Sequence, residues 1–129
     1  MGQSTKLLLD TDVIIEYLRN RDPAVAFIES LEGILLVSVM TLAELFTGVK
    51  DAIEEAAIDD FLTPFEIISV GPAIAKQAGR YRQQYKQSHG MGMVDAILAA
   101  TAESEGAILV SFNQRHYPML PNLIVPYKR

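Results

Sequence analysis

The sequence predicts an α/β fold, in which a mostly parallel sheet lies between two helical layers as a three-layer α/β/α sandwich. Short apolar segments of strand type alternate along the chain with longer segments of helical periodicity. This order is typical of a parallel sheet whose crossover helices cover both faces. The length of 129 residues suits one hydrophobic core, so we expect a single domain over residues 1–129.

The first half of the chain is expected to supply two strands and four helices. Three consecutive leucines before Asp10 indicate a strand at 6–10 that is buried on both faces, and residues 34–37 form a second apolar run. Helical periodicity and the starting and stopping signals Pro23, Gly33 and Pro64 set the helix boundaries. We expect these helices at residues 13–19, 23–31, 40–49 and 52–62.

The second half repeats the pattern. Residues 65–70 and 107–110 are the third and fourth strand candidates, and residues 123–125 are a possible last strand. Long helices are expected from Pro72 to about residue 87 and over 93–105, because glycines mark the ends of both segments. The prolines at 118 and 121 indicate that residues 113–120 are irregular.

The composition of the chain excludes several functional classes. The net charge of −5 argues against a protein that coats nucleic acid by bulk electrostatics. Because cysteine is absent, any metal must be held by oxygen ligands or by the two histidines. No uncharged apolar run approaches the roughly 20 residues that a membrane span needs, and the N-terminus lacks the apolar region of a signal peptide. We therefore expect a soluble, cytoplasmic protein with no membrane partner.

Asp10 and Glu44 each allow two interpretations. Asp10 follows the first predicted strand and Ser111 the fourth, and ligand sites of open α/β sheets form outside these carboxyl ends. Asp10 could equally be the N-cap of the following helix. Residues 41–44 match a capping box, so local sequence favours a cap or surface role for Glu44.

Asp95 is harder to explain by capping. Residues 93–102 are apolar or small on nearly every side of the predicted helix, which should therefore be almost fully enclosed. A lone carboxylate there has to be paired, neutral or bound to a metal. The helix dipole offers it only about 0.3–1 kcal/mol, which is too little to offset burial of a bare charge.

Together, four segments resemble the PIN-domain nucleases, and most of all the VapC-type toxins of toxin–antitoxin pairs. They are LLLDTDVIIEYL from Leu7, VSVMTLAELFTG from Val37, MVDAILAATA from Met93 and LVSFNQRHYP from Leu109. Their order and spacing, and the chain length, agree with that family over essentially the whole chain. The resemblance implies Mg²⁺ or Mn²⁺ as cofactor, RNA as substrate, a homodimer and a small inhibiting antitoxin protein as partners.

The resemblance also implies roles for individual residues. Asp10, Glu44 and Asp95 match the metal-binding acids of the family. Asp10 and Asp95 would be the principal ligands, and Glu44 would act as a ligand through water or as a base. Ser111 and Asn113 would position water or phosphate. The family often has a fourth acid where this chain has Asn113, so a second metal would be held more weakly.

The chain also has a basic stretch over residues 76–89. Arg80 and Arg82 within it, and Arg115 beyond it, are candidates for RNA contact, with an ordinary surface role as the alternative.

Two other functions fit parts of the sequence. A haloacid-dehalogenase-like phosphatase would use Asp10 as nucleophile and Asp12 as general acid. That family also needs a Lys and an acidic pair after later strands, and here the fourth predicted strand is followed by Ser111 and Asn113 without an acid. A receiver-like module also fits Asp10 and Asp12, but in this chain no later predicted strand ends in an Asp that could be phosphorylated, and no Lys follows the fourth strand. A catalytically degenerate PIN domain that only binds proteins is the other alternative.

Overall fold

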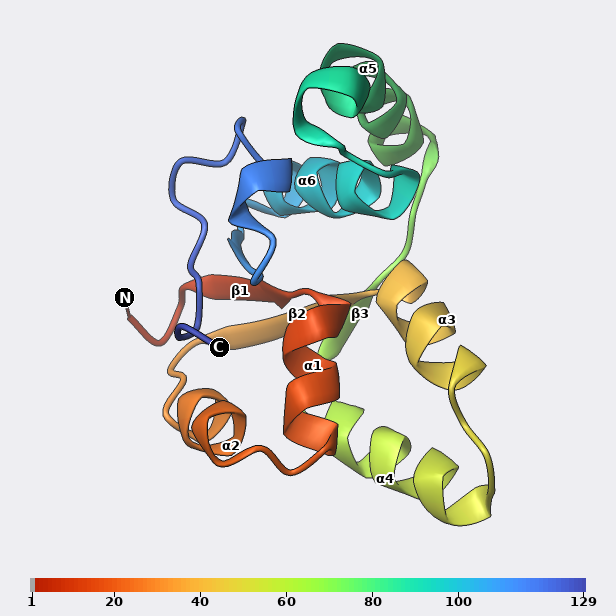
Figure 1. Ribbon diagram of the computed structural model, residues 1–129, viewed down its shortest axis with the longest axis vertical. Coiled ribbons are helices and arrows are strands. Elements are labelled where there is room, and N and C mark those ends of the chain that lie inside the picture. The colour runs from red at the N-terminus through yellow and green to blue at the C-terminus, as the bar shows by residue number, and fades with distance from the viewer. Residues whose placement is uncertain (1) are drawn as a thin grey trace.

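A four-stranded parallel sheet runs through the middle of the molecule, as Figure 1 shows for the computed structural model. The structure describes residues 2–129. The strands are β1 (Lys6–Leu9), β2 (Ile34–Ser38), β3 (Glu66–Ile68) and β4 (Ile108–Val110). Their order in the sheet is β3-β2-β1-β4, so the chain moves outward from β1 on one side and then returns to its other side.

This reversal decides which helices cover each face, because parallel crossovers are right-handed. In Figure 1, α5 and α6 lie on one face of the sheet, and α1, α2 and α4 lie on the other. The helices are α1 (Thr11–Leu18), α2 (Asp22–Glu29), α3 (Val39–Thr47), α4 (Ala52–Leu62), α5 (Pro72–His89) and α6 (Met93–Glu105), followed by the short 3-10 helix η1 (Gln114–His116). The predicted three-layer α/β/α sandwich is confirmed.

Alternation along the strands divides the core in two. Leu8 of β1 pairs with Leu36 of β2 and Leu109 of β4, and all three pack in the cluster formed with α5 and α6. Leu7 and Leu9 belong to the opposite cluster, with α1, α2, α3 and α4. Leu7, Leu8 and Leu9 are all completely buried, although their side chains point alternately to the two faces of the sheet. Helices cover both faces, which explains the unbroken run of leucines in β1.

The predicted boundaries of the helices and of the four strands hold within two residues, and three differences have a physical reason. Helix α1 begins at Thr11 because the Asp10 side chain caps it. Strand β3 is shorter than the predicted 65–70, since it is the edge strand and pairs only with β2. The possible strand at 123–125 amounts to one bridge, between Ile124 and Val110. Within residues 2–129, no helix is long and apolar enough to cross a membrane.

Gly33 is the residue directly before β2, and its backbone conformation requires glycine. Replacing it should destabilise the fold. Its φ of +138° is rarely adopted by other residues, and an added Cβ would overlap the backbone oxygen of Thr5. That oxygen accepts a 2.8 Å hydrogen bond from Ile34 N. We expect Gly33→Ala to lower the free energy of unfolding by about 2 kcal/mol or more, as measured by urea titration.

The matched control is Gly79→Ala in α5, where no atom beyond the adjoining residues and the helix's own backbone lies within 4 Å of the added Cβ. Alanine should raise helix stability there by up to about 1 kcal/mol. Equal effects of the two substitutions would contradict this account of Gly33.

Candidate active site

The site lies where the strand order reverses, between the carboxyl ends of β1 and β4. Ligands of open α/β sheets bind outside such a switch point. Asp10 follows β1 and Ser111 follows β4, and the Ser111 hydroxyl donates a 2.8 Å hydrogen bond to Asp10 Oδ2. Asp10 N also donates to Val110 O at 2.9 Å, so the backbone of the adjacent strand fixes the position of this acid. The predicted association of Asp10 with Ser111 is therefore present.

Asp10 is the most buried acid of the site, with 6% of its surface exposed. Burial, followed by repulsion from the Asp12 carboxylate, raises the pKa of Asp10 to about 7. Hydrogen bonds from Ser111 and from Thr11 N, the latter at 2.7 Å, act in the opposite direction and only partly offset burial. Asp10 is thus both the N-cap of α1 and a carboxylate that lacks a compensating positive charge.

Tyr117, which the sequence reasoning did not single out, connects Asp10 to Asp95. Its hydroxyl lies 3.3 Å from Asp10 Oδ2 and 3.1 Å from Asp95 Oδ1. Its ring is 2% exposed and packs in the cluster beneath α6. Burial and the two carboxylates together raise the pKa of Tyr117, so the phenol keeps its proton. Acids 85 positions apart in the sequence are thereby joined through one hydroxyl group.

Asp95 is less enclosed than its neighbours in the sequence suggest. Residues 96–102 are all buried, as predicted, but the Asp95 side chain is 20% exposed because it projects from the first turn of α6. Its Oδ2 accepts a 3.2 Å hydrogen bond from Gly92 N, so Asp95 is also a capping residue. His116 Nδ1 lies 3.0 Å from the same oxygen. The expectation that the helix leaves Asp95 no exposed face was wrong, and Asp10 is the more buried of the two acids.

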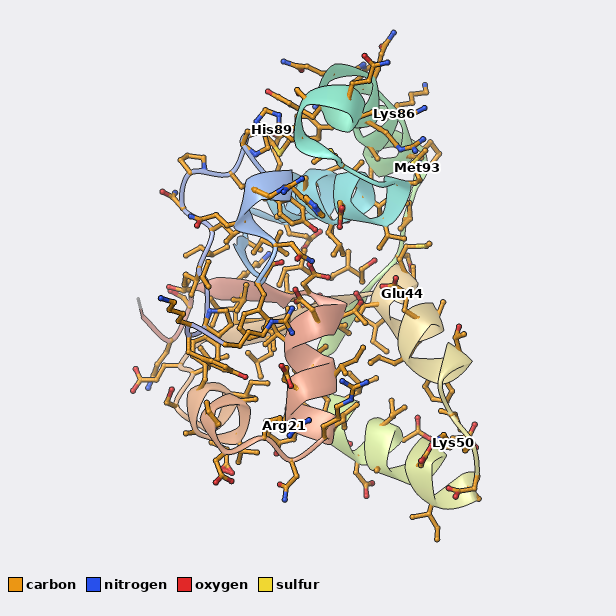
Figure 2. All side chains as sticks on the ribbon, viewed as in Figure 1. Arg21, Glu44, Lys50, Lys86, His89 and Met93 are labelled. Carbon is orange, nitrogen blue, oxygen red and sulfur yellow. The ribbon has the colours of Figure 1, made fainter. Side chains whose placement is uncertain are left out.

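Glu44 does not form the capping box predicted for residues 41–44. Helix α3 begins earlier, at Val39, because Ser38 caps it by accepting a 3.0 Å hydrogen bond from Met40 N. The Glu44 carboxylate instead accepts a 2.5 Å hydrogen bond from the Thr11 hydroxyl, which connects α3 to the first turn of α1 (Figure 2). Glu44 is therefore connected to Asp10 through Thr11, whose hydroxyl donates to Glu44 and whose backbone N donates to Asp10.

Thr11 and Thr41 are two further residues of the site that sequence reasoning missed. Their hydroxyls lie 3.1 Å apart, and both side chains are buried. A threonine directly after the strand-ending acid was the available signal, since a hydroxyl there faces the same edge of the sheet. Together these side chains hold Glu44 beside the first turn of α1.

Ser111 and Asn113 interact with each other. Ser111 Oγ accepts a 3.0 Å hydrogen bond from Asn113 N while donating to Asp10, so it has a fixed direction. Asn113 begins the turn into η1, and its side chain is half-buried. A water- or phosphate-positioning role for both residues stays a prediction.

The three arginines occupy different surroundings. Arg80 and Arg82 are two positions apart in α5 and so point in roughly opposite directions. Arg80 is exposed and donates to Gln77 at 3.2 Å, whereas Arg82 is half-buried. Arg115 of η1 is exposed and adjoins His116, which contacts Asp95. Of the three, Arg115 is the one that adjoins in sequence a residue in contact with a site acid, so it is the better candidate for contact with a substrate phosphate.

The donor set fits a hard divalent cation held by two carboxylates. Among residues 2–129, no three histidine, aspartate or glutamate side chains lie close enough to hold one ion as they stand. Asp10 and Asp95, however, direct one oxygen each at the same hydroxyl, and burial leaves Asp10 in need of a positive charge. Mg²⁺ in proteins typically takes one or two carboxylates and keeps several waters, which matches this pair.

Asp12 makes a structural contact in place of the general-acid role that a phosphatase would require. Its Oδ2 accepts a 3.1 Å hydrogen bond from Phe112 N, which ties the first turn of α1 to the segment after β4. Burial raises the pKa of Asp12, while the Phe112 hydrogen bond and the charge of Arg129 lower it. Asp12 therefore joins two segments of the fold through Oδ2, and this contact gives no support to its use as a general acid.

Comparisons with known proteins agree with this fold and site. Residues 7–119 match the family model of the PIN domain. Ribonuclease VapC10 of Mycobacterium tuberculosis is 33% identical over 124 residues, which cover 94% of this chain and 92% of the relative. The tRNA(fMet)-specific endonuclease VapC of Shigella flexneri is 29% identical over 124 residues, with 92% and 94% covered.

A solved structure shows the same architecture. The toxin–antitoxin complex from Klebsiella pneumoniae superimposes with a TM-score of 0.83 at 28% identity, and the match covers 95% of this chain and 99% of that one. The chain therefore belongs to the PIN-domain family, among the VapC-type ribonucleases. The predicted resemblance is confirmed, and the phosphatase alternative is not favoured.

Proposed function

We propose that this chain is a metal-dependent endoribonuclease whose centre is the carboxylate pair Asp10 and Asp95. One observation carries the proposal: acids from the end of β1 and the start of α6 converge on a single hydroxyl at the switch point of the sheet. Membership of a family whose relatives are named ribonucleases supports RNA as the substrate. The degenerate PIN domain is disfavoured because the carboxylate pair is retained.

Each polar residue of the site has a task in this proposal. Asp10 and Asp95 supply the oxygens that would hold Mg²⁺ or Mn²⁺. Ser111 fixes the direction of the Asp10 carboxylate through its 2.8 Å hydrogen bond. Thr11 holds Glu44 at the first turn of α1, and we assign Glu44 the task of orienting a water or accepting its proton. When bound, the cation would polarise the scissile phosphate and lower the pKa of an attacking water. We assign Asn113 and Arg115 the task of orienting the phosphate.

We also propose a small antitoxin protein as partner. The solved structures similar to this chain include a toxin–antitoxin complex from Klebsiella pneumoniae and VapBC2 of Rickettsia felis bound to a promoter DNA fragment. The Rickettsia felis match has a TM-score of 0.75 at 26% identity. The homodimer and the cytoplasmic location implied at the sequence level stay predictions.

RNA cleavage by the purified protein tests the proposed function. With 5′-labelled tRNA and messenger RNA as probes, we expect internal cleavage in Mg²⁺ or Mn²⁺, none in excess chelator, and recovery when the cation is restored. Gel analysis of a time course measures the rate. Cleavage that persists undiminished in chelator would remove the metal from the proposal, and absence of cleavage of either RNA under all conditions would contradict the activity.

A further inference from the structure

The Tyr117 hydroxyl occupies the space between the two carboxylates. It lies 3.1 Å from Asp95 Oδ1 and 3.3 Å from Asp10 Oδ2, at the end of a ring that the core holds in place. The hydroxyl cannot swing away without moving that ring, because Tyr117 is 2% exposed. The phenol is therefore a fixed group at the centre of the site.

The hydroxyl engages the carboxylate oxygens that a shared cation would use. Asp10 Oδ1 accepts from Thr11 N, and Asp95 Oδ2 accepts from Gly92 N and approaches His116. The other two oxygens, Asp10 Oδ2 and Asp95 Oδ1, converge on the phenol, and Asp10 Oδ2 also accepts the 2.8 Å hydrogen bond from the Ser111 hydroxyl. A cation joining the acids through these oxygens would have to replace the hydroxyl as their common partner.

The phenol cannot donate a hydrogen bond to Asp10 and Asp95 at the same time. Its hydroxyl has one proton, which can be donated to only one carboxylate at a time, so the other faces the phenolic oxygen. The arrangement is nevertheless better than two neighbouring carboxylates with no donor between them, because like charges repel. The hydroxyl thus stabilises the metal-free protein in particular.

We propose that Tyr117 is a positioning residue that competes with the divalent cation, holding Asp10 and Asp95 together in the metal-free protein at the expense of metal affinity. This inference rests on the proposed metal site. By linkage, a contact made only in the metal-free state weakens metal binding by the free energy of that contact. Tyr117 would then set the cation concentration at which the nuclease becomes active.

The substitution Tyr117→Phe tests the inference with little change in packing, because the ring stays in the core. Without the hydroxyl, the metal-free carboxylates lose a donor, and binding of the cation relieves more repulsion. We expect Tyr117→Phe to bind Mn²⁺ roughly three- to tenfold more tightly, the change expected from removing one hydrogen bond. The metal-free variant should also melt at a lower temperature, and the temperature shift caused by Mn²⁺ should be larger than in the wild type.

Tyr81→Phe is the matched control. Tyr81 is also a buried tyrosine whose hydroxyl donates to a carboxylate, that of Glu103, and it joins α5 to α6. Calorimetric titration with MnCl₂ should give the wild-type dissociation constant for this variant. An unchanged or weaker Mn²⁺ affinity of Tyr117→Phe, with wild-type binding intact, would overturn the inference while leaving the proposed metal site standing. Failure of the wild type to bind Mn²⁺ would overturn both.

A spectroscopic measurement on the wild type gives a second test. The chain has five tyrosines and no tryptophan, so its near-ultraviolet absorption reports mainly on phenols. A phenol that donates to a carboxylate absorbs at longer wavelength, and we expect saturation with Mg²⁺ to shift part of the band to shorter wavelength. Tyr117→Phe should lack this difference spectrum. A wild-type spectrum that does not change on Mg²⁺ binding would contradict loss of the hydrogen bonds between the phenol and the carboxylates.

Discussion

Replacing Asp95 with asparagine should lower metal-dependent RNA cleavage by at least about a hundredfold and leave the fold intact, because the site loses one of its two cation-binding charges. The fold should persist because an asparagine oxygen can still accept from Gly92 N, which donates to Asp95 at 3.2 Å. The side chain is 20% exposed, so the amide meets no tightly packed surface. Initial rates of RNA cleavage at saturating Mg²⁺ measure the effect.

Asp60→Asn provides the control for the Asp95 prediction. Asp60 is an exposed acid of α4, on the opposite face of the sheet from α6, and its substitution changes the net charge equally. We expect a rate within about twofold of wild type. If Asp95→Asn retained more than a tenth of the wild-type rate, Asp95 would not be a principal ligand.

The Asp10→Asn variant should be inactive and yet more stable than the metal-free wild type at pH 8. The native pKa of Asp10 is raised to about 7 by burial, whereas its ordinary value is 3.8. Between these values the native protein binds more protons than the unfolded chain, so the contribution of Asp10 to stability is present below about pH 4 and is lost as the pH rises through about 7. Asparagine is neutral at every pH and escapes this loss.

The gain at pH 8 should be about 2–4 kcal/mol, and it should vanish near pH 4. Asparagine fits the site because the Ser111 and Tyr117 hydroxyls can accept from its amide as readily as they donate to the carboxylate. Urea unfolding in chelator at several pH values measures the difference. A variant less stable than wild type at pH 8 would show that Asp10 is satisfied without a cation.

The fold was predictable because local pattern and long-range topology agree. The helix at 52–62 begins and ends where the sequence indicates, since Asp51 caps it by accepting from Glu54 N at 2.9 Å. The helix at 93–105 also matches, because glycines precede and follow it. The leucines of β1 indicated a strand buried on both faces, and alternating packing against two helical layers explains why all three are completely buried.

The connections within the site were less predictable, because tertiary contacts override local motifs. Thr41 and Glu44 match a capping box, but their side chains are engaged by Thr11 from another helix. Tyr117 lies in a segment that sequence reasoning treated as irregular, and nothing local indicates that its hydroxyl reaches two distant acids. The family pattern indicated which acids matter, whereas the structure shows how two of them are joined.

Diffraction from Mn²⁺-soaked crystals tests most directly whether Asp10 and Asp95 share one cation. The anomalous signal of manganese locates the ion independently of activity. We expect a peak within coordination distance of both carboxylates, at about 2.0–2.3 Å from one oxygen of each. A peak that contacts neither acid, or no peak at a Mn²⁺ concentration that supports cleavage, would contradict the metal site on which this account of the protein depends.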